Sequence, residues 1–150
     1  MAQADGPDAN PNVSLAKIYL KDVSLEAPYS PEVFTVPDLS APRATVDFRS
    51  SSKLLPNGTY DVSLTLTVTA KNETRTIFLV EVEQAGIFMI SNVSESNVLD
   101  WVLKVRCPNI LFPYAREAVD NLVVKAGFPP LMLAPVNFRT VDAQVPQESP

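Results

Sequence analysis

The sequence predicts an α+β fold, in which a four-stranded antiparallel sheet carries helices on one face. Three observations lead to this prediction. Four segments before residue 85 alternate apolar and polar residues, as half-buried strands do. A Pro-Asn-Gly turn separates two of these segments and indicates an antiparallel hairpin. The last third of the chain instead carries apolar residues at helical spacing, and strands followed by helices are typical of α+β architecture.

The first strand is expected from Ser14 to Glu26. Its alternation changes phase near Lys21 and Asp22, which indicates a β-bulge or a strand covered on parts of both faces. A long connection to Arg43 follows, and its four prolines are incompatible with a helix. A loop of this length usually has a function, such as crossing the sheet edge or lining a binding site. The apolar residues interleaved with the prolines are Tyr29, Phe34, Val36 and Leu39.

The next three strands are expected to form a meander. Alternation over residues 44–49 marks the second strand, and the clearest alternation in the chain, from Thr59 to Ala70, marks the third. The Pro-Asn-Gly turn between them favours the positive φ angles of a tight hairpin. After a short polar turn at 71–74, alternation resumes from Arg75 to Gln84. These strands should therefore be antiparallel neighbours.

Helices are expected in the last third of the chain. The first should begin at Ser94 and end at Pro108, with Val98, Trp101, Val102 and Val105 on one apolar stripe. The second should begin at Pro113 and end at Gly127, which precedes a Phe-Pro-Pro segment. Small residues dominate its stripe, so a sheet, another helix or a symmetry-related copy could approach closely; the stripe consists of Ala115, Ala118, Val119, Leu122 and Ala126. A last short helix is expected from Arg139 to Val145.

The length of 150 residues suits one domain with a sizeable core, expected over residues 13–145. Residues 1–12 and 146–150 are expected to be disordered extensions. Apolar residues make up 46% of the chain, yet no apolar run approaches the roughly 20 residues of a membrane span. The surplus apolar surface is therefore expected in oligomer interfaces and binding grooves. The polar N-terminus shows no secretory signal, so we expect a cytoplasmic protein.

The residue types argue against catalysis and cofactor binding. The chain has no histidine, which excludes Ser-His-Asp and Cys-His systems and removes the commonest metal ligand. Cys107 is the single cysteine and is expected to be a small buried apolar residue. We expect no catalytic residue, no metal and no cofactor. A net charge of −5 without a basic cluster also argues against nucleic acid as a partner, because phosphate binding needs a basic face.

The fourth strand carries an unusual combination of residues. If its apolar set at positions 78, 80 and 82 faces the helices, then Ile77, Leu79, Glu81 and Glu83 face away, which places Leu79 in solvent beside acids. Such a surface suits docking of a basic partner with an apolar anchor, although an ordinary solvated sheet face is the alternative interpretation. Asp22 and Glu26 on the first strand share a face if no bulge lies between them.

Three segments resemble one family. The sequence Cys-Pro-Asn-Ile-Leu-Phe-Pro-Tyr-Ala-Arg-Glu at 107–117 is closely similar to the signature segment of the SecB family of bacterial protein-export chaperones. Segments 131–138, Leu-Met-Leu-Ala-Pro-Val-Asn-Phe, and 18–28, Ile-Tyr-Leu-Lys-Asp-Val-Ser-Leu-Glu-Ala-Pro, resemble the same family in the same order. The resemblance implies a four-stranded antiparallel sheet covered by helices on one face, and assembly as a homotetramer, a dimer of dimers.

The resemblance also implies two binding sites. Docking of the translocation ATPase SecA is implied for Asp22, Glu26, Leu79 and Glu81. A precursor-binding groove is implied for residues of the proline-rich connection and of the segment after the second helix, namely Phe34, Val36, Leu39, Leu131, Leu133 and Phe138.

The implied function is that of an ATP-independent chaperone. It would bind unfolded secretory precursor proteins, keep them competent for translocation and deliver them to SecA, so that it meets the membrane only indirectly. Several shallow apolar grooves on one tetramer would bind a long chain tightly, because later contacts form at high effective concentration. The alternatives are a SecB-like chaperone dedicated to a single client such as an antitoxin and, with less support, a small apolar-ligand carrier.

Overall fold

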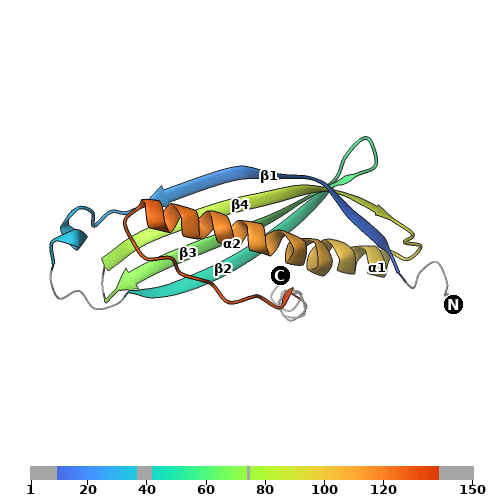
Figure 1. Ribbon diagram of the computed structural model, residues 1–150. Coiled ribbons are helices and arrows are strands. Elements are labelled where there is room, and N and C mark those ends of the chain that lie inside the picture. The colour runs from blue at the N-terminus through green and yellow to red at the C-terminus, as the bar shows by residue number, and fades with distance from the viewer. Residues whose placement is uncertain (1–9, 37–41, 74, 139–150) are drawn as a thin grey trace.

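The computed structural model describes residues 10–36, 42–73 and 75–138, and these form one antiparallel sheet with a long helix across one face (Figure 1). The strands are β1 (Asn12–Glu26), β2 (Arg43–Leu54), β3 (Tyr60–Asn72) and β4 (Arg75–Ser91). Their order in the sheet is β1-β4-β3-β2. The predicted fold class, a four-stranded antiparallel sheet with helical cover, is therefore confirmed. Residues 1–9 of the expected N-terminal extension, the expected C-terminal extension and the helix expected at 139–145 lie outside the described residues, whereas Asn12, predicted to belong to the N-terminal extension, is the first residue of β1.

The β2–β3 hairpin follows the predicted turn. Both strands pair without interruption from Arg43 opposite Lys71 to Leu54 opposite Tyr60. At the turn Gly58 has a φ of +89°, which an L side chain rarely adopts. The side-chain oxygen of Asn57 accepts a hydrogen bond from the backbone N–H of Thr59 at 3.2 Å and stabilises the turn.

Strand β4 extends to Ser91, seven residues beyond the predicted end. Its middle is packed tightly: a Cβ on Gly86 would lie 2.9 Å from Leu15 Cδ1 and 3.1 Å from Leu111 Cδ2. The glycine thus lets β1 and the helix approach the strand from the same face. Sequence alternation alone did not reveal this continuation, because Ala85 and Gly86 interrupt the apolar pattern.

Strand pairing is irregular at three places, of which one confirms a prediction and another corrects the predicted face of Ile77. In β1 the register shifts between Leu15 and Lys17 and again between Leu20 and Asp22, so the expected bulge near Lys21 is confirmed. Between β3 and β4 the register shifts at Ala70, which leaves Ile77 without a partner across the ladder. Ile77 is fully buried, like Phe78, and the prediction that it faces away from the helix is wrong. The bulge places two consecutive apolar residues in the core.

The helical region is one continuous rod rather than two helices. It comprises α1 (Ser96–Trp101), a π-helical segment (Val102–Arg106) and α2 (Cys107–Lys125). The prediction of a break at Pro108 is wrong. The backbone N–H of Cys107 donates to the carbonyl of Val102, five residues earlier, and this wider turn relieves the clash that a proline ring makes with the preceding turn. The N-cap position of α1 is Glu95, one residue after the predicted Ser94, and the Glu95 side chain makes no capping hydrogen bond.

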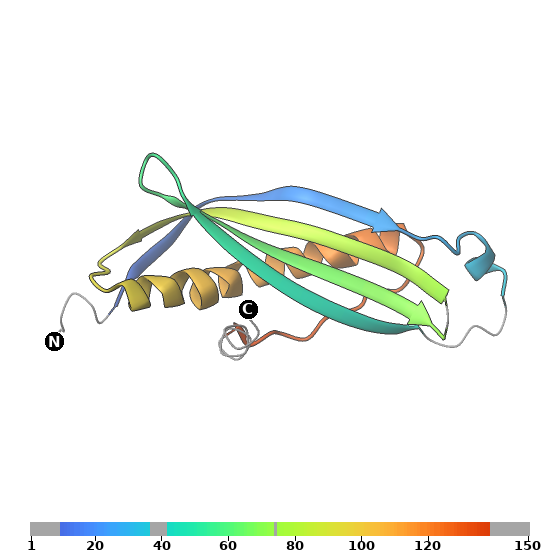
Figure 2. The ribbon, with the colours of Figure 1, turned by 180° about the vertical axis from the view of Figure 1, so that it is seen from behind.

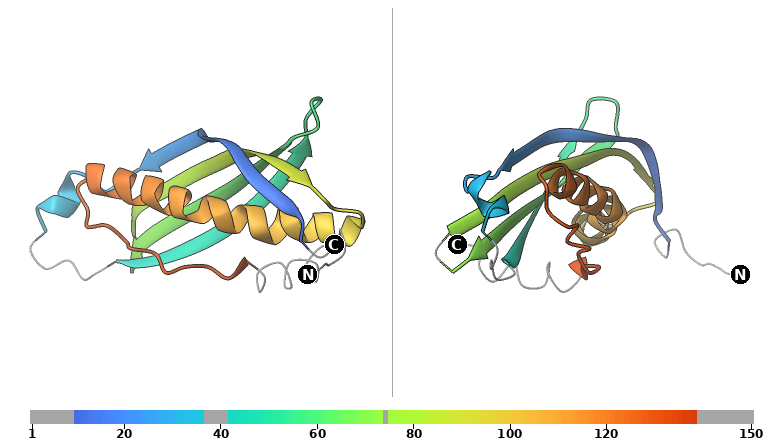
Figure 3. Two further views of the ribbon diagram at one scale, coloured as in Figure 1. Left: turned by 45° about the vertical axis from the view of Figure 1, so that its right-hand side comes forward. Right: turned by 60° about the vertical axis from the view of Figure 1, so that its left-hand side comes forward.

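Helix α2 packs on β4 and β3, and the sheet curves around it (Figure 3, right). Its buried residues include three of the predicted stripe, Ala115, Ala118 and Val119, together with Leu111, Phe112 and Val123. The predicted end at Gly127 is confirmed: Gly127 has a φ of +100°, and the backbone N–H of Phe128 donates to Val123 at 3.1 Å. The chain then returns alongside α2 on the β2 side (Figures 1 and 3).

Candidate functional site

One candidate site lies on the sheet face opposite α2, which Figure 2 shows from the front. In the ladder between β1 and β4, Glu26 lies opposite Leu79 and Asp22 lies opposite Glu83. Residues directly opposite one another share a face of an antiparallel sheet, and residues 79, 81 and 83 alternate onto that face. The structure therefore brings together the four residues expected to dock SecA, and Glu83 joins them. We call the set Asp22, Glu26, Leu79, Glu81 and Glu83 the acidic face.

The bulge in β1 is compatible with this arrangement. Asp22 and Glu26 were expected to share a face only if no bulge lies between them, and the register shift lies before both residues. Pairing from Asp22 to Glu26 is regular, so these two carboxylates point the same way.

One carboxylate of the acidic face, that of Glu81, has polar partners on β2 and β3. Glu81 accepts a hydrogen bond from the Thr67 hydroxyl at 3.0 Å, and its carboxylate lies 3.5 Å from Arg49 Nη2. Leu79 is half-buried, which is less exposed than the alternation predicts, because Glu26 and Thr69 flank it on the neighbouring strands. The face thus offers a shallow apolar contact within a ring of carboxylates.

A polar network that sequence reasoning missed lies beside the acidic face. Lys21 Nζ donates to Asp61 Oδ2 at 2.7 Å and to Ser63 Oγ at 3.0 Å. The Tyr19 hydroxyl donates to the other oxygen of Asp61 at 2.7 Å. The only signal of this network in the sequence is the change of phase near Lys21.

The network changes the protonation equilibria of its members. Burial acts to raise the pKa of Asp61, but the hydrogen bonds from Lys21 and Tyr19 outweigh it and hold that pKa below its ordinary value. The hydrogen bond to Asp61 raises the pKa of Lys21. Burial, together with Asp61, raises the pKa of Tyr19. At neutral pH the network therefore holds a charged Lys21–Asp61 pair.

A second candidate site is an apolar cavity of about 360 Å³ at the end of α2. Ala44 on β2, Ala70 on β3 and Ile77 on β4 line one side. Phe128 and Leu131, which follow α2, line the other. Four segments of the chain thus meet around one apolar space, and among the expected groove residues that the structure describes, Leu131 alone lines it.

Phe34 of the proline-rich connection packs at this end of the molecule. Its ring lies 5.4 Å from the ring of Phe128, which in turn lies 5.1 Å from Phe78, measured between centroids. Phe34 remains 54% exposed, and Val36 is exposed as well, so both can meet a ligand. The Cζ atom of Arg75 lies 4.1 Å from the centre of the Tyr29 ring, and this cation–π contact joins the proline-rich connection to the start of β4. Leu39 lies outside the described residues.

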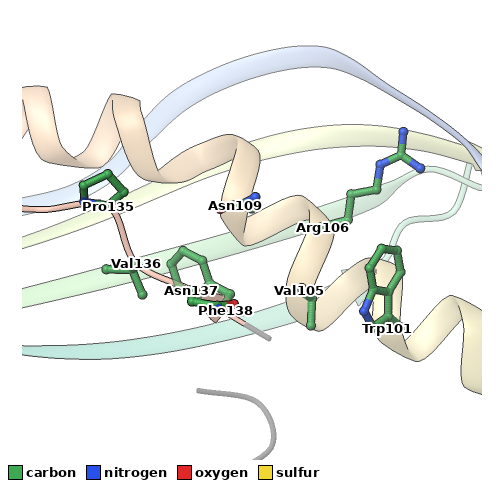
Figure 4. A pocket seen from close by; sticks show the side chains of 8 residues that line it. All are labelled: Trp101, Val105, Arg106, Asn109, Pro135, Val136, Asn137 and Phe138. Atoms are coloured by element: carbon green, nitrogen blue, oxygen red, sulfur yellow. The ribbon is translucent and has the colours of Figure 1, made fainter. Parts of the chain in front are cut away.

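A third candidate site is a cavity of about 680 Å³ between the helical rod and the C-terminal segment (Figure 4). Trp101, Arg106 and Asn109 of the rod line it, with Val136 and Phe138 opposite. Phe138 itself is only 4% exposed; its ring lies 5.9 Å from the ring of Phe48 and 6.0 Å from that of Phe112. The structure therefore places Phe138 in the core beside this cavity and apart from Leu131.

The C-terminal segment is fastened to α2 between these two cavities. Asp120 accepts a hydrogen bond from the backbone N–H of Leu131 at 2.9 Å, and Arg116 donates to the carbonyl of Leu133 at 3.4 Å. Leu133 is half-buried. The five expected groove residues that the structure describes thus do not form one continuous site.

Other chemistry at these sites is limited. Within the described residues, no group of three or more Cys, Asp or Glu side chains could hold a metal ion. Burial raises the pKa of the Cys107 thiol to about 12, which keeps it protonated and unreactive. None of the described helices has the length and apolar character needed to cross a membrane.

Comparison with known proteins decides the family. The family model described as preprotein translocase subunit SecB matches residues 6–149. The chain belongs to the SecB family. It is 46% identical to the protein-export protein SecB of Methylobacillus flagellatus, over 97% of this chain and 91% of that protein. It is 48% identical to that of Chromobacterium violaceum, over 91% and 89% respectively.

A solved structure supports the fold. The SecB-like chaperone of Mycobacterium tuberculosis, in complex with a peptide from an antitoxin, superposes with a TM-score of 0.68 at 18% identity. The match covers 83% of this chain and 90% of that one. At this identity the likeness shows a common fold only. The identification as a SecB family member therefore rests on the sequence comparisons.

Proposed function

We propose that this chain is an ATP-independent protein-export chaperone, which binds unfolded precursor proteins, keeps them competent for translocation and delivers them to SecA. The observation that carries the proposal is the match to the SecB family over residues 6–149. Relatives that are 46–49% identical along nearly the whole chain are protein-export proteins.

The holding step uses exposed apolar surface at the end of α2. The 360 Å³ cavity and the neighbouring Phe34, Val36 and Leu131 offer contacts to apolar side chains of an extended polypeptide. We propose Leu39 in the proline-rich connection and Leu133 on the C-terminal segment as further client contacts, whereas Phe138, which is only 4% exposed, supports that segment from the core. One such site binds weakly, so we propose a homotetramer, a dimer of dimers, in which one client occupies several sites. A protein that folds quickly buries its apolar segments before capture.

The delivery step uses the acidic face. Asp22, Glu26 and Glu81 attract a basic surface of SecA and accelerate encounter, whereas Leu79 supplies the apolar anchor. The face lies on the side of the sheet opposite α2 (Figure 2). A chaperone loaded with precursor can therefore dock without first releasing its client.

The remaining properties follow from this role. We propose that the protein works in the cytoplasm, reaches the membrane only through SecA, binds no nucleic acid, needs no cofactor and catalyses no reaction. A chaperone dedicated to one client such as an antitoxin is not favoured, because the SecB-like chaperone solved with an antitoxin peptide is only 18% identical. A carrier of small apolar ligands is not favoured either, because the relatives that match nearly the whole chain are protein-export proteins.

The test is refolding of a slow-folding secretory precursor, without ATP, in the presence of an equimolar amount of the purified protein. Intrinsic fluorescence of the precursor reports its folding. Arrested refolding is the expected result, and a fast-folding variant of the same precursor should escape capture. Unchanged refolding of the slow precursor would contradict general holding activity.

A further inference from the structure

The bulge in β1 determines which side chains reach the acidic face. Leu20 lies opposite Gln84 and Asp22 lies opposite Glu83, so two consecutive residues of β4 pair with residues of β1 that are two apart. Lys21 is the extra residue. With strict alternation from Tyr19 onward, Asp22 and Glu26 would point toward α2, because a slip of one residue moves every side chain to the other face.

Contacts from both sides hold this bulge. On the outer side Lys21 donates to Asp61 at 2.7 Å and to Ser63 at 3.0 Å. From the other side Gln84, which lies opposite the buried Leu64, donates through Nε2 to the carbonyl of Tyr19 at 2.9 Å. Gln84 is only 5% exposed, so this hydrogen bond lies in a largely dry environment where an unpaired amide is costly.

The hydrogen bonds of Lys21 on the outer face connect strands that are not neighbours in the sheet. Asp61 belongs to β3, which does not neighbour β1, and it also accepts a hydrogen bond from the Tyr19 hydroxyl. The Asp61 side chain is 12% exposed and that of Lys21 is 37% exposed. A charged pair of this geometry, with two further hydroxyl partners, restrains the lysine much more than a lone surface ion pair does.

We propose that Lys21 is a positioning residue for the acidic face: its bonds to Asp61 and Ser63 hold the bulge that turns Asp22 and Glu26 outward. The inference rests on the proposed docking of SecA to this face. Lys21 does not need to touch the partner. The competing explanation is that Val23 and Leu25, opposite Val82 and Val80, hold the register by themselves.

The sign of the effect separates positioning from simple electrostatics. Lys21→Met removes a positive charge beside an acidic surface, which should strengthen attraction of a basic partner if charge alone matters. If Lys21 positions Asp22, the same substitution weakens docking. The matched control is Lys53→Met. Lys53 lies on β2 opposite Asp61, so its substitution removes the same charge from the surroundings of Asp61.

The experiment measures SecA affinity of the tetramer by isothermal titration calorimetry at one salt concentration. We expect Lys21→Met to weaken binding about tenfold, the scale of a lost hydrogen bond to a charged group. Lys21→Arg should restore most of the affinity, and Lys53→Met should leave it unchanged or slightly stronger. Amide hydrogen exchange at residues 20–24 should accelerate in Lys21→Met alone.

Two further measurements separate the possible failures. Arrest of precursor refolding should be the same for Lys21→Met as for the wild-type protein, which excludes general unfolding as the cause. Leu79→Arg reports whether the acidic face docks SecA at all. If Leu79→Arg abolishes docking and Lys21→Met binds as Lys53→Met does, only the role of Lys21 is wrong. If Leu79→Arg binds normally, the docking surface and the role of Lys21 are both wrong.

Discussion

Gly127 and Phe34 should be coupled in stability, although they lie in segments far apart in sequence. Gly127 has a φ of +100°, and a Cβ at this position would lie 2.8 Å from Cζ of Phe34. Gly127→Ala therefore introduces backbone strain of about 1–2 kcal/mol. It also displaces the Phe34 ring from Phe128, with which it is in contact at 5.4 Å.

The loss of the Phe34 contact can be estimated from its burial. Fully burying a phenylalanine contributes about 1.5–3 kcal/mol. Phe34 is 54% exposed, so its buried part contributes roughly half of this amount, about 1 kcal/mol, which would be lost if the ring were displaced. Gly127→Ala should thus cost about 2–3 kcal/mol in the wild-type background and about 1–2 kcal/mol in a Phe34→Ala background.

The assay is a double-mutant cycle with urea unfolding followed by circular dichroism, at one fixed protein concentration because assembly contributes to stability. The expected interaction energy between the two positions is about 1 kcal/mol. Additivity within about 0.3 kcal/mol would refute the contact between Phe34 and the helix end. The same variants should lose precursor holding, because the displaced ring lies beside the apolar cavity.

Three further predictions concern other parts of the structure. Leu79→Arg should abolish SecA binding, measured by calorimetry, and leave arrest of precursor refolding intact. Leu54→Arg, at an exposed leucine of β2, should affect neither activity. Equal loss of both activities in Leu79→Arg would reject the docking assignment. The folded-state pKa of Asp61 lies below its unfolded value of about 3.9, so the carboxylate contributes stability that is present above that pH and is lost as the pH falls through the folded value. Asp61→Asn should therefore lower the free energy of unfolding at pH 7 and reduce the loss of stability as the pH falls, as measured by urea midpoints between pH 7 and pH 3. If stability fell with pH as steeply in the variant as in the wild-type protein, the lowered pKa of Asp61 would be contradicted. Finally, Cys107 should resist a thiol reagent at pH 8 in the native protein and react in urea, since burial raises its pKa to about 12; rapid labelling of the native protein would show that this part of α2 opens.

Local patterns predicted most of the fold. The β2–β3 hairpin, the ends of β1 and α2, and the bulge near Lys21 follow from alternation and from glycine positions, which act between neighbours along the chain. The prediction of a helix break at Pro108 was wrong for an equally local reason, because a π-helical turn accommodates the proline. No feature of the sequence indicated that turn.

The candidate sites were predictable in unequal measure. The four residues expected to dock SecA were chosen from strand spacing and family resemblance, and the register places them on one face. The groove residues could not be assigned in this way, because the sequence does not indicate whether an apolar residue in a loop packs inward. Phe138 proved to be part of the core, whereas Phe34 remains half-exposed. Sequence reasoning did not identify Ile77 and Phe128 as cavity-lining residues for the same reason.

The sequence by itself determined the fold class, the family and the acidic character of one sheet face, because strand period, turn chemistry and charge are properties of adjacent residues. Only the tertiary structure decided that Ile77 turns inward, that the helical rod is continuous, and that Lys21 reaches Asp61 on a strand two places away. These outcomes depend on pairing register and on contacts between residues some 40 positions apart, where the hydrogen bonds and packing of partner segments, rather than local preference, select the conformation.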